Sequence, residues 1–185
     1  MIIGVTGRIA TGKTTLARIL EKHGFLRIDA DYIYHGLLET SAEMKNELSK
    51  RFGSHERKSL LAAVQSDKSA LSDLNSITHK YVAAEIKRRV MKNEDEDYVL
   101  DVPVPVKIGF RDIAESIIVT TCSKDTQLER IIARDVISVS QAELKINMQK
   151  ESSFYNELGD VVINTDGMTM ADLTKTMEEI LNFDS

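Results

Sequence analysis

Residues 1–15 combine a short apolar run with the pattern G-x-x-x-x-G-K-T, which extends from Gly7 to Thr14. Glycine at the two fixed positions, Gly7 and Gly12, allows backbone angles that a Cβ would forbid, so successive N–H groups can curl around polyphosphate oxygens. Lys13 then places a positive charge beside the β- and γ-phosphates, and the Thr14 hydroxyl can bind Mg²⁺. The pattern therefore predicts a phosphate-binding loop for a nucleotide and Mg²⁺.

The residues around this loop predict a strand before it and a helix after it. Residues 2–6 are a short apolar run typical of a buried parallel strand, whereas Leu16, Ile19 and Leu20 recur at helical spacing. Gly24 follows two basic residues, as expected for the glycine that ends a helix. The helix would direct the positive end of its dipole at the bound phosphates.

Composition narrows the class of partner. The 185 residues carry a formal net charge of −5, which argues against nucleic acid or an anionic membrane as the main partner and favours small phosphorylated molecules. The single cysteine, Cys122, excludes a disulfide within the chain and fits a reducing compartment. No leader-like or long apolar segment is found, and the sequence begins with the first core strand. We expect a cytoplasmic, monomeric protein.

Strand and helix patterns alternate along much of the chain. Strands are predicted near residues 2–6, 25–29, 98–102, 116–121 and 161–164. This alternation predicts a three-layer α/β/α domain with a five-stranded parallel sheet that binds ligands at the carboxyl ends of its strands. We expect a core of residues 1–35, 96–124 and 159–185, a helical substrate-binding insertion over 36–95, and a small lid over 125–158.

Carboxylates follow the second and third predicted strands. Asp29 and Asp31 come after the second, where a carboxylate could orient an attacking hydroxyl and accept its proton, with Asp31 preferred. The alternative is that one of them caps the next helix. Asp101 ends the third strand, where it could hold Mg²⁺ or its waters, or simply begin a turn.

Further motifs occur in a fixed order along the chain. They are Thr6–Thr14 (T-G-G-I-x-[ST]-G-K-[ST]), Asp29–Asp31 (D-A-D), Phe52–Leu60 (F-G, then D-R-x-x-L), Leu74–His79 (L-N-x-I-x-H-P), Asp101–Pro103 (D-[VI]-P), Gln127–Arg134 (Q-x-x-R-x-x-x-R) and Asp160–Gly167 (D-x-V-I-x-N-x-G). Their order and spacing resemble the dephospho-coenzyme A kinase family over almost the whole chain. The resemblance implies ATP-dependent phosphorylation of the ribose 3′-hydroxyl of dephospho-coenzyme A, the last step of coenzyme A synthesis.

The resemblance also implies roles for individual residues. Asp31 and Lys13 would be catalytic, with Asp31 the general base and Thr14 the Mg²⁺ ligand. ATP would contact Gly7, Ile9, Ala10, Thr11, Gly12, Lys13, Thr14 and Thr15, with Asn164 near adenine. Candidates for the acceptor site are Asp29, Arg57, Asn75, His79 and Asp101, and candidates for the lid are Arg130, Arg134 and Lys145.

Several residues depart from the family pattern. Arg8 replaces a loop glycine, His35 replaces an arginine, and Lys107 replaces an acidic residue. Tyr155 stands near the position of a lid lysine, and Lys145 could supply the positive charge that the lid would otherwise lack. Three alternatives therefore stay open: a P-loop kinase for a nucleoside monophosphate or metabolite alcohol, a relative that binds ATP without transferring phosphate, and a nucleotide-dependent regulatory module. The sequence lacks the D-x-x-G and N-K-x-D motifs expected of the last.

Overall fold

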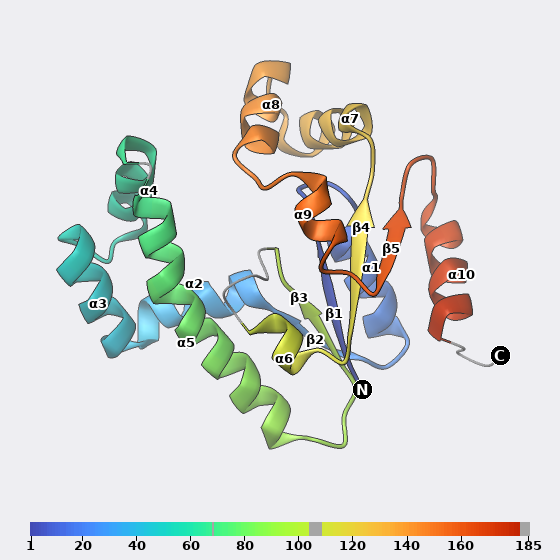
Figure 1. Cartoon of the computed structure of the whole chain (residues 1–185), viewed down its shortest axis with the longest axis horizontal. Coiled ribbons are helices and arrows are strands. Elements are labelled where there is room, and N and C mark those ends of the chain that lie inside the picture. The colour runs from blue at the N-terminus through green and yellow to red at the C-terminus, as the bar shows by residue number, and fades with distance from the viewer. Residues whose placement is uncertain (68, 104–108, 182–185) are drawn as a thin grey trace. The chain divides into compact units, whose positions relative to one another are not determined.

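The computed structural model describes residues 1–67, 69–103 and 109–181 (Figure 1). The described residues form two compact units. The first takes in residues 1–28, 95–103 and 114–181, and the second takes in 29–67, 69–94 and 109–113.

A five-stranded parallel sheet is the centre of the first unit, as the sequence predicted. Its strands are β1 (Ile2–Gly7), β2 (Leu26–Asp29), β3 (Tyr98–Asp101), β4 (Ser116–Thr121) and β5 (Val161–Asn164), in the order β2-β3-β1-β4-β5. The register pairs Val5 with Asp101, Gly7 with Thr120, and Thr121 with Asn164. The carboxyl ends of β1, β3, β4 and β5 therefore meet at one edge of the sheet.

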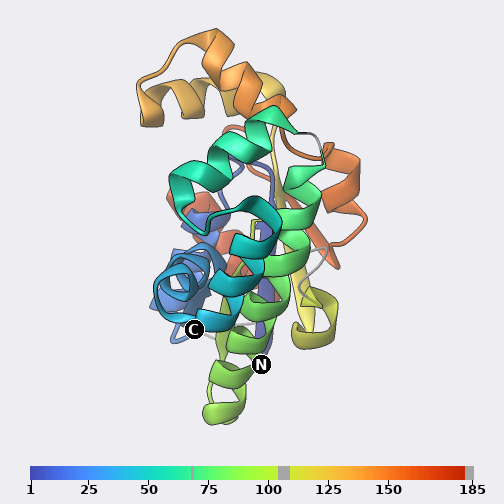
Figure 2. The ribbon, with the colours of Figure 1, turned by 90° about the vertical axis from the view of Figure 1, so that its left-hand side faces the viewer.

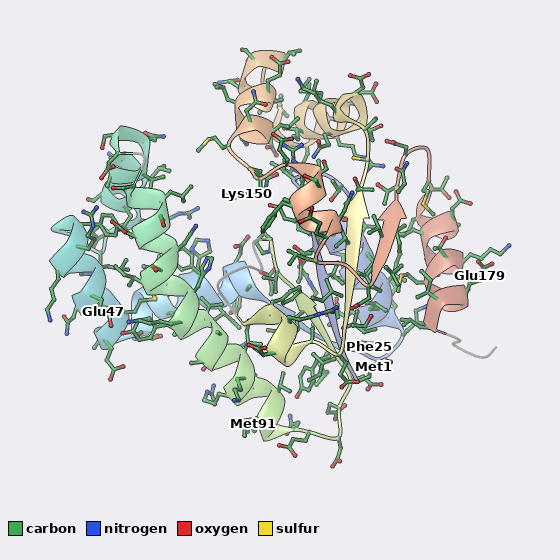
Figure 3. The ribbon with its side chains drawn as sticks, viewed as in Figure 1. Met1, Phe25, Glu47, Met91, Lys150 and Glu179 are labelled. Carbon is green, nitrogen blue, oxygen red and sulfur yellow. The ribbon has the colours of Figure 1, made fainter. Side chains whose placement is uncertain are left out.

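Two helices pack against each other beside one face of this sheet. They are α1 (Lys13–Lys22) and α10 (Met170–Leu181), which lie side by side in Figure 1. Leu16 and Leu20 of α1 are fully buried in a cluster that also contains Ile3 and Val5 of β1 and Met177 of α10. Phe25, labelled in Figure 3, belongs to the same cluster. Gly24 has a φ of 97°, which confirms the predicted end of α1.

The chain between β4 and β5 forms three helices, α7 (Lys124–Asp135), α8 (Val139–Asn147) and α9 (Ser152–Asn156). α7 and α8 pack together around Ile131, Ala142 and Ile146, and Ile9 and Ala10 of the β1–α1 loop pack against this cluster. α9 contacts β1 and β4. After α9, the chain passes Val119 so closely that Gly159 has no room for a Cβ.

The second unit is helical throughout its described part. It contains α2 (Ala30–Thr40), α3 (Ala42–Phe52), α4 (Arg57–Ser66), α5 (Ala70–Lys92) and the short α6 (Phe110–Ile113). α2, α3 and α4 all contact the long α5, and Figure 2 shows α3 and α4 beside it. Met44, Leu48 and Leu60 form the apolar centre of this packing.

A polar contact also joins α3 to α5. Glu47, labelled in Figure 3, accepts hydrogen bonds from Lys80 Nζ at 2.6 Å and from the Tyr81 hydroxyl at 2.7 Å. The bond to the Glu47 carboxylate raises the pKa of Tyr81 to about 12, because the carboxylate favours the protonated phenol. Across the described residues, no helix is both long and apolar enough to span a membrane.

The close passage at Gly159 gives a stability prediction. A Cβ on Gly159 would lie 2.7 Å from Val119 Cγ2 and 3.3 Å from Val119 Cβ, so we expect Gly159→Ala to lower the free energy of unfolding by about 1–3 kcal/mol. Gly36→Ala is the matched control, because Gly36 is inside α2 with open space around it and should gain about 0.5–1 kcal/mol. Urea unfolding measures both. Equal stability of the two variants would contradict the packing described.

Candidate active site

The loop between β1 and α1 has the conformation that its glycines permit. Gly7 and Gly12 have φ values of 145° and 101°, and Ala10 has a φ of 61°. A Cβ on Gly7 would collide with the carbonyl oxygen of Thr120. At Gly12 the nearest atom to such a Cβ is Thr165 Cγ2 at 3.5 Å, an ordinary contact, so the left-handed backbone and not space requires glycine there.

One side chain of this loop and three from other segments hold its carbonyl groups. Thr11 Oγ1 donates to Arg8 O (2.8 Å), Gln127 Nε2 to Ile9 O (2.8 Å), Arg130 Nη1 to Ala10 O (3.1 Å) and Thr165 Oγ1 to Thr11 O (2.9 Å). We call these four contacts the carbonyl clamp. Four successive backbone oxygens are therefore fixed on protein donors, which keeps them from turning towards a bound anion.

Arg130 is the largest part of this clamp. Besides Ala10 O, its guanidinium donates to Thr165 Oγ1 at 2.9 Å and to Thr165 O at 2.8 Å. Gln127 and Thr165 are almost fully buried, 1% and 3% exposed. The sequence predicted Arg130 as a lid cation, which stays a prediction, and the structure shows this residue supporting the loop. Gln127 and Thr165 were missed, although each lies inside or beside a motif that the sequence reveals.

A cavity of about 450 Å³ opens at the start of α1. It is lined by Ala10, Gly12, Lys13, Thr14, Thr15, Arg18, Arg130 and Arg134. These residues contribute four cationic side chains and no carboxylate. The first turn of α1 has no side-chain cap and no acidic residue, so its N–H groups remain for a ligand. The cavity has the chemistry of a polyphosphate site.

The cavity brings together five of the predicted ATP-binding residues and both predicted lid arginines. Arg18 is an addition that sequence analysis missed, although its position four residues after Thr14 places both on one face of α1. Gly7, Ile9 and Thr11, which were also predicted to contact ATP, belong to the same stretch of chain but not to this lining. Asn164 ends β5, and its Oδ1 accepts a hydrogen bond from Asp166 N at 3.0 Å, so it shapes the turn that carries Thr165.

The donor set at this site fits Mg²⁺ held together with phosphate oxygens. Thr14 is exposed and lines the cavity, so its hydroxyl can serve as one oxygen ligand. Asp101 is already engaged, because its Oδ2 accepts a hydrogen bond from Arg27 Nη2 at 2.7 Å and its side chain is 7% exposed. Mg²⁺ prefers to keep water and phosphate ligands, which suits a site with few protein donors.

Arg134 and Lys145, the other two predicted lid cations, share one carboxylate. Asp135 Oδ1 accepts from Arg134 Nε at 2.7 Å, and Asp135 Oδ2 accepts from Lys145 Nζ at 2.6 Å. These two cations hold the pKa of Asp135 well below its usual range. Arg134 reaches the cavity, whereas Lys145 is not part of its lining.

Arg8 links the loop to the end of α8. Its Nη2 donates to Ile146 O at 2.8 Å, and the neighbouring Ile9 N donates to Gln149 Oε1 at 2.7 Å. Tyr155, another departure from the family pattern, is buried, and burial raises the pKa of its hydroxyl. The arginine that replaces a loop glycine therefore ties the loop to the last turn of α8.

The predicted acceptor residues lie in the second unit, apart from Asp101. Asp29 Oδ1 accepts from Tyr32 N at 3.0 Å, which is the helix-capping role left open above. Asp31 is exposed in the first turn of α2, and Arg57 is exposed at the start of α4. Asn75 and His79 are half-buried, one turn apart on α5. Lys107 lies outside the described residues.

The strand order, the glycine-bounded loop and the cationic cavity at the start of α1 define a P-loop nucleotide-binding fold of the kinase type. The family model for dephospho-CoA kinase matches residues 1–171. This chain therefore belongs to the dephospho-CoA kinase family.

Relatives and a solved structure agree with that assignment. A dephospho-CoA kinase from Fusobacterium nucleatum subsp. nucleatum is 33% identical, with 96% of this chain and 95% of the relative aligned. One from Carboxydothermus hydrogenoformans is 32% identical, with 97% and 91% aligned. The structure of dephospho-CoA kinase from Campylobacter jejuni has a TM-score of 0.66 and 25% identity, covering 98% of this chain and 95% of that one.

Alanine substitutions of the two arginines of α7 should lower the free energy of unfolding by different amounts. Arg130→Ala removes three hydrogen bonds and leaves two backbone oxygens without that donor, so we expect a loss of about 2–3 kcal/mol in the free energy of unfolding. Arg134→Ala removes an exposed ion pair and should cost less than about 1 kcal/mol. Both variants should bind Mg-ATP more weakly. Denaturant unfolding and titration calorimetry check this, and unchanged stability of Arg130→Ala would contradict the carbonyl clamp.

Proposed function

We propose that this protein transfers the γ-phosphoryl group of Mg-ATP to the ribose 3′-hydroxyl of dephospho-coenzyme A, in the cytoplasm, as the last step of coenzyme A synthesis. The observation that carries the proposal is the four-cation cavity at the start of α1 in a chain that belongs to this kinase family. The cavity supports the nucleotide half of the reaction. Family membership supports the acceptor.

The first unit would bind and orient the triphosphate. Backbone N–H groups from Gly12 onward and the Lys13 ammonium would neutralise the β- and γ-phosphates, and Arg18 and Arg134 would add charge from the sides of the cavity. Thr14 would hold Mg²⁺, which when bound spreads the charge that develops on the transferring phosphoryl group. Because the carbonyl clamp already fixes the backbone of the loop, little of the loop would have to become ordered when the nucleotide binds.

Asp31 would act on the acceptor in the second unit. Its carboxylate would accept a hydrogen bond from the 3′-hydroxyl, orient the oxygen, and take the proton as the bond to the γ-phosphorus forms. The bond between the γ-phosphorus and the β,γ-bridging oxygen breaks in the same step, and ADP leaves with that oxygen. Asp31 is suited to this role because it is exposed in the first turn of α2, and Asp29 serves as the cap of that helix.

The direct test is to incubate the purified protein with Mg-ATP and dephospho-coenzyme A and to identify coenzyme A by mass spectrometry. We expect coenzyme A and ADP in equal amounts. A panel of other acceptors, including nucleoside monophosphates and metabolite alcohols, should give much slower ADP release. Absence of coenzyme A under conditions in which calorimetry shows ATP binding would refute the proposed reaction.

The two aspartates of the D-A-D motif provide a matched pair of variants. Asp31→Asn should lower kcat by a factor of about 10²–10⁴, because an amide cannot take the proton. Asp29→Asn should retain most of the activity, because the asparagine amide oxygen can still accept the hydrogen bond from Tyr32 N. Initial rates of coenzyme A formation compare them. If Asp31→Asn keeps full activity, Asp31 is not the base.

A further inference from the structure

The helical unit contains a polar cavity of its own, of about 570 Å³. It is lined by His35, Leu38 and Glu39 of α2, Lys45 of α3, His55 and Glu56 of the α3–α4 connection, and Arg57 at the start of α4. All of these residues belong to the second unit. The lining brings four nitrogen-bearing side chains that can donate hydrogen bonds to one place.

The contacts of this cavity leave several of its donors unused. His55 Nδ1 lies 3.1 Å from Ser49 Oγ, and His55 Nε2 lies 3.9 Å from Glu56 Oε1, so Glu56 is directed to the imidazole. Lys45 Nζ donates to the backbone oxygen of Glu39 at 2.9 Å. Within the described residues, neither Lys45 nor Arg57 forms an ion pair with a carboxylate. The ammonium and the guanidinium can therefore both serve an anion.

The cavity lies on the same face of α2 as Asp31. Asp31, His35 and Leu38 are spaced i, i+4 and i+7, and four residues of α-helix advance by about 6 Å. Tyr34, which is also on α2, feels both groups: burial raises the pKa of its hydroxyl, the Arg57 charge lowers it and the Asp31 charge raises it. The lining thus begins one helical turn from the carboxylate that the proposed function makes the base.

That spacing matches the chemistry of a nucleotide acceptor. In dephospho-coenzyme A the 3′-hydroxyl and the 5′-diphosphate leave the same ribose, so a hydroxyl placed at Asp31 puts the diphosphate about one sugar away. We propose that this cavity binds the 5′-diphosphate of the acceptor, with Arg57, Lys45 and His35 donating to its oxygens. The inference rests on the proposed function and adds the site that selects a diphosphate ester over a plain nucleoside.

Because the lining contains two carboxylates, we expect it to recognise the diphosphate through directed hydrogen bonds more than through net positive charge. Glu39 and Glu56 balance Lys45 and Arg57 when both histidines are neutral. A guanidinium presents a fixed fork of donors to phosphate oxygens, whereas an imidazole N–H presents one donor. Replacing His35 by arginine should therefore strengthen recognition of the diphosphate, and removing Arg57 should weaken it most.

The test compares dephospho-coenzyme A with adenosine, which has the ribose and base without the diphosphate. Calorimetry without ATP gives the dissociation constants, and ADP release with Mg-ATP gives kcat/KM for each acceptor. For His35→Ala and Arg57→Ala we expect the preference for dephospho-coenzyme A over adenosine to fall roughly 10- to 100-fold. His35→Arg should keep or raise it. Lys58→Ala is the matched control, because Lys58 is exposed beside Arg57 and outside the cavity lining.

The possible results distinguish a failure of the diphosphate site from a failure of the proposed reaction. An unchanged preference in both alanine variants overturns it and leaves the proposed reaction standing if coenzyme A is still made. Binding of dephospho-coenzyme A no tighter than adenosine by the wild type also overturns it. If the wild type binds dephospho-coenzyme A selectively, and the variants lose that selectivity, the diphosphate site is supported even when no phosphoryl transfer is found, and only the proposed reaction fails.

Discussion

The hydrogen bonds that hold the carbonyl oxygens of residues 8–11 are the constraint on which the rest of the first unit depends. A loop that binds phosphate through its N–H groups must prevent its own oxygens from facing the ligand, and water alone would not fix them. Here each oxygen has a side-chain donor, and three of the four donors come from α7 and the turn after β5. The sheet register makes this arrangement possible because it brings the ends of β1, β4 and β5 together.

The same constraint explains the arrangement of the segment between β4 and β5. Gln127 and Arg130 attach α7 to the loop, while Arg8 and Gln149 attach the end of α8. Ile9 and Ala10 add apolar contacts with the cluster between α7 and α8. A long cation at position 8 is therefore compatible with phosphate binding, because its guanidinium is directed to a backbone oxygen of α8.

Much of the fold could be predicted from local pattern, because strand runs, helical spacing and glycine positions depend on neighbouring residues. The five strands and the helix end at Gly24 were predicted within a residue or two. Thr165 and Arg18 were not found, since their roles arise only when distant segments meet in the folded chain. Asp29 shows a different limit: the sequence allowed either a cap or a substrate contact, and only the hydrogen bond to Tyr32 N identified the cap. The functions of the remaining site residues stay predictions.

The most direct test of this account is a crystal structure with Mg²⁺ and a non-hydrolysable ATP analogue. We expect the β- and γ-phosphates to lie against Gly12, Lys13 and Thr14, the four hydrogen bonds of the carbonyl clamp to remain, and the Cα atoms of residues 7–15 to move by less than about 1 Å, as is usual for a preorganised site. A loop that breaks these hydrogen bonds and rebuilds around the nucleotide, or an analogue bound elsewhere, would contradict the central claim.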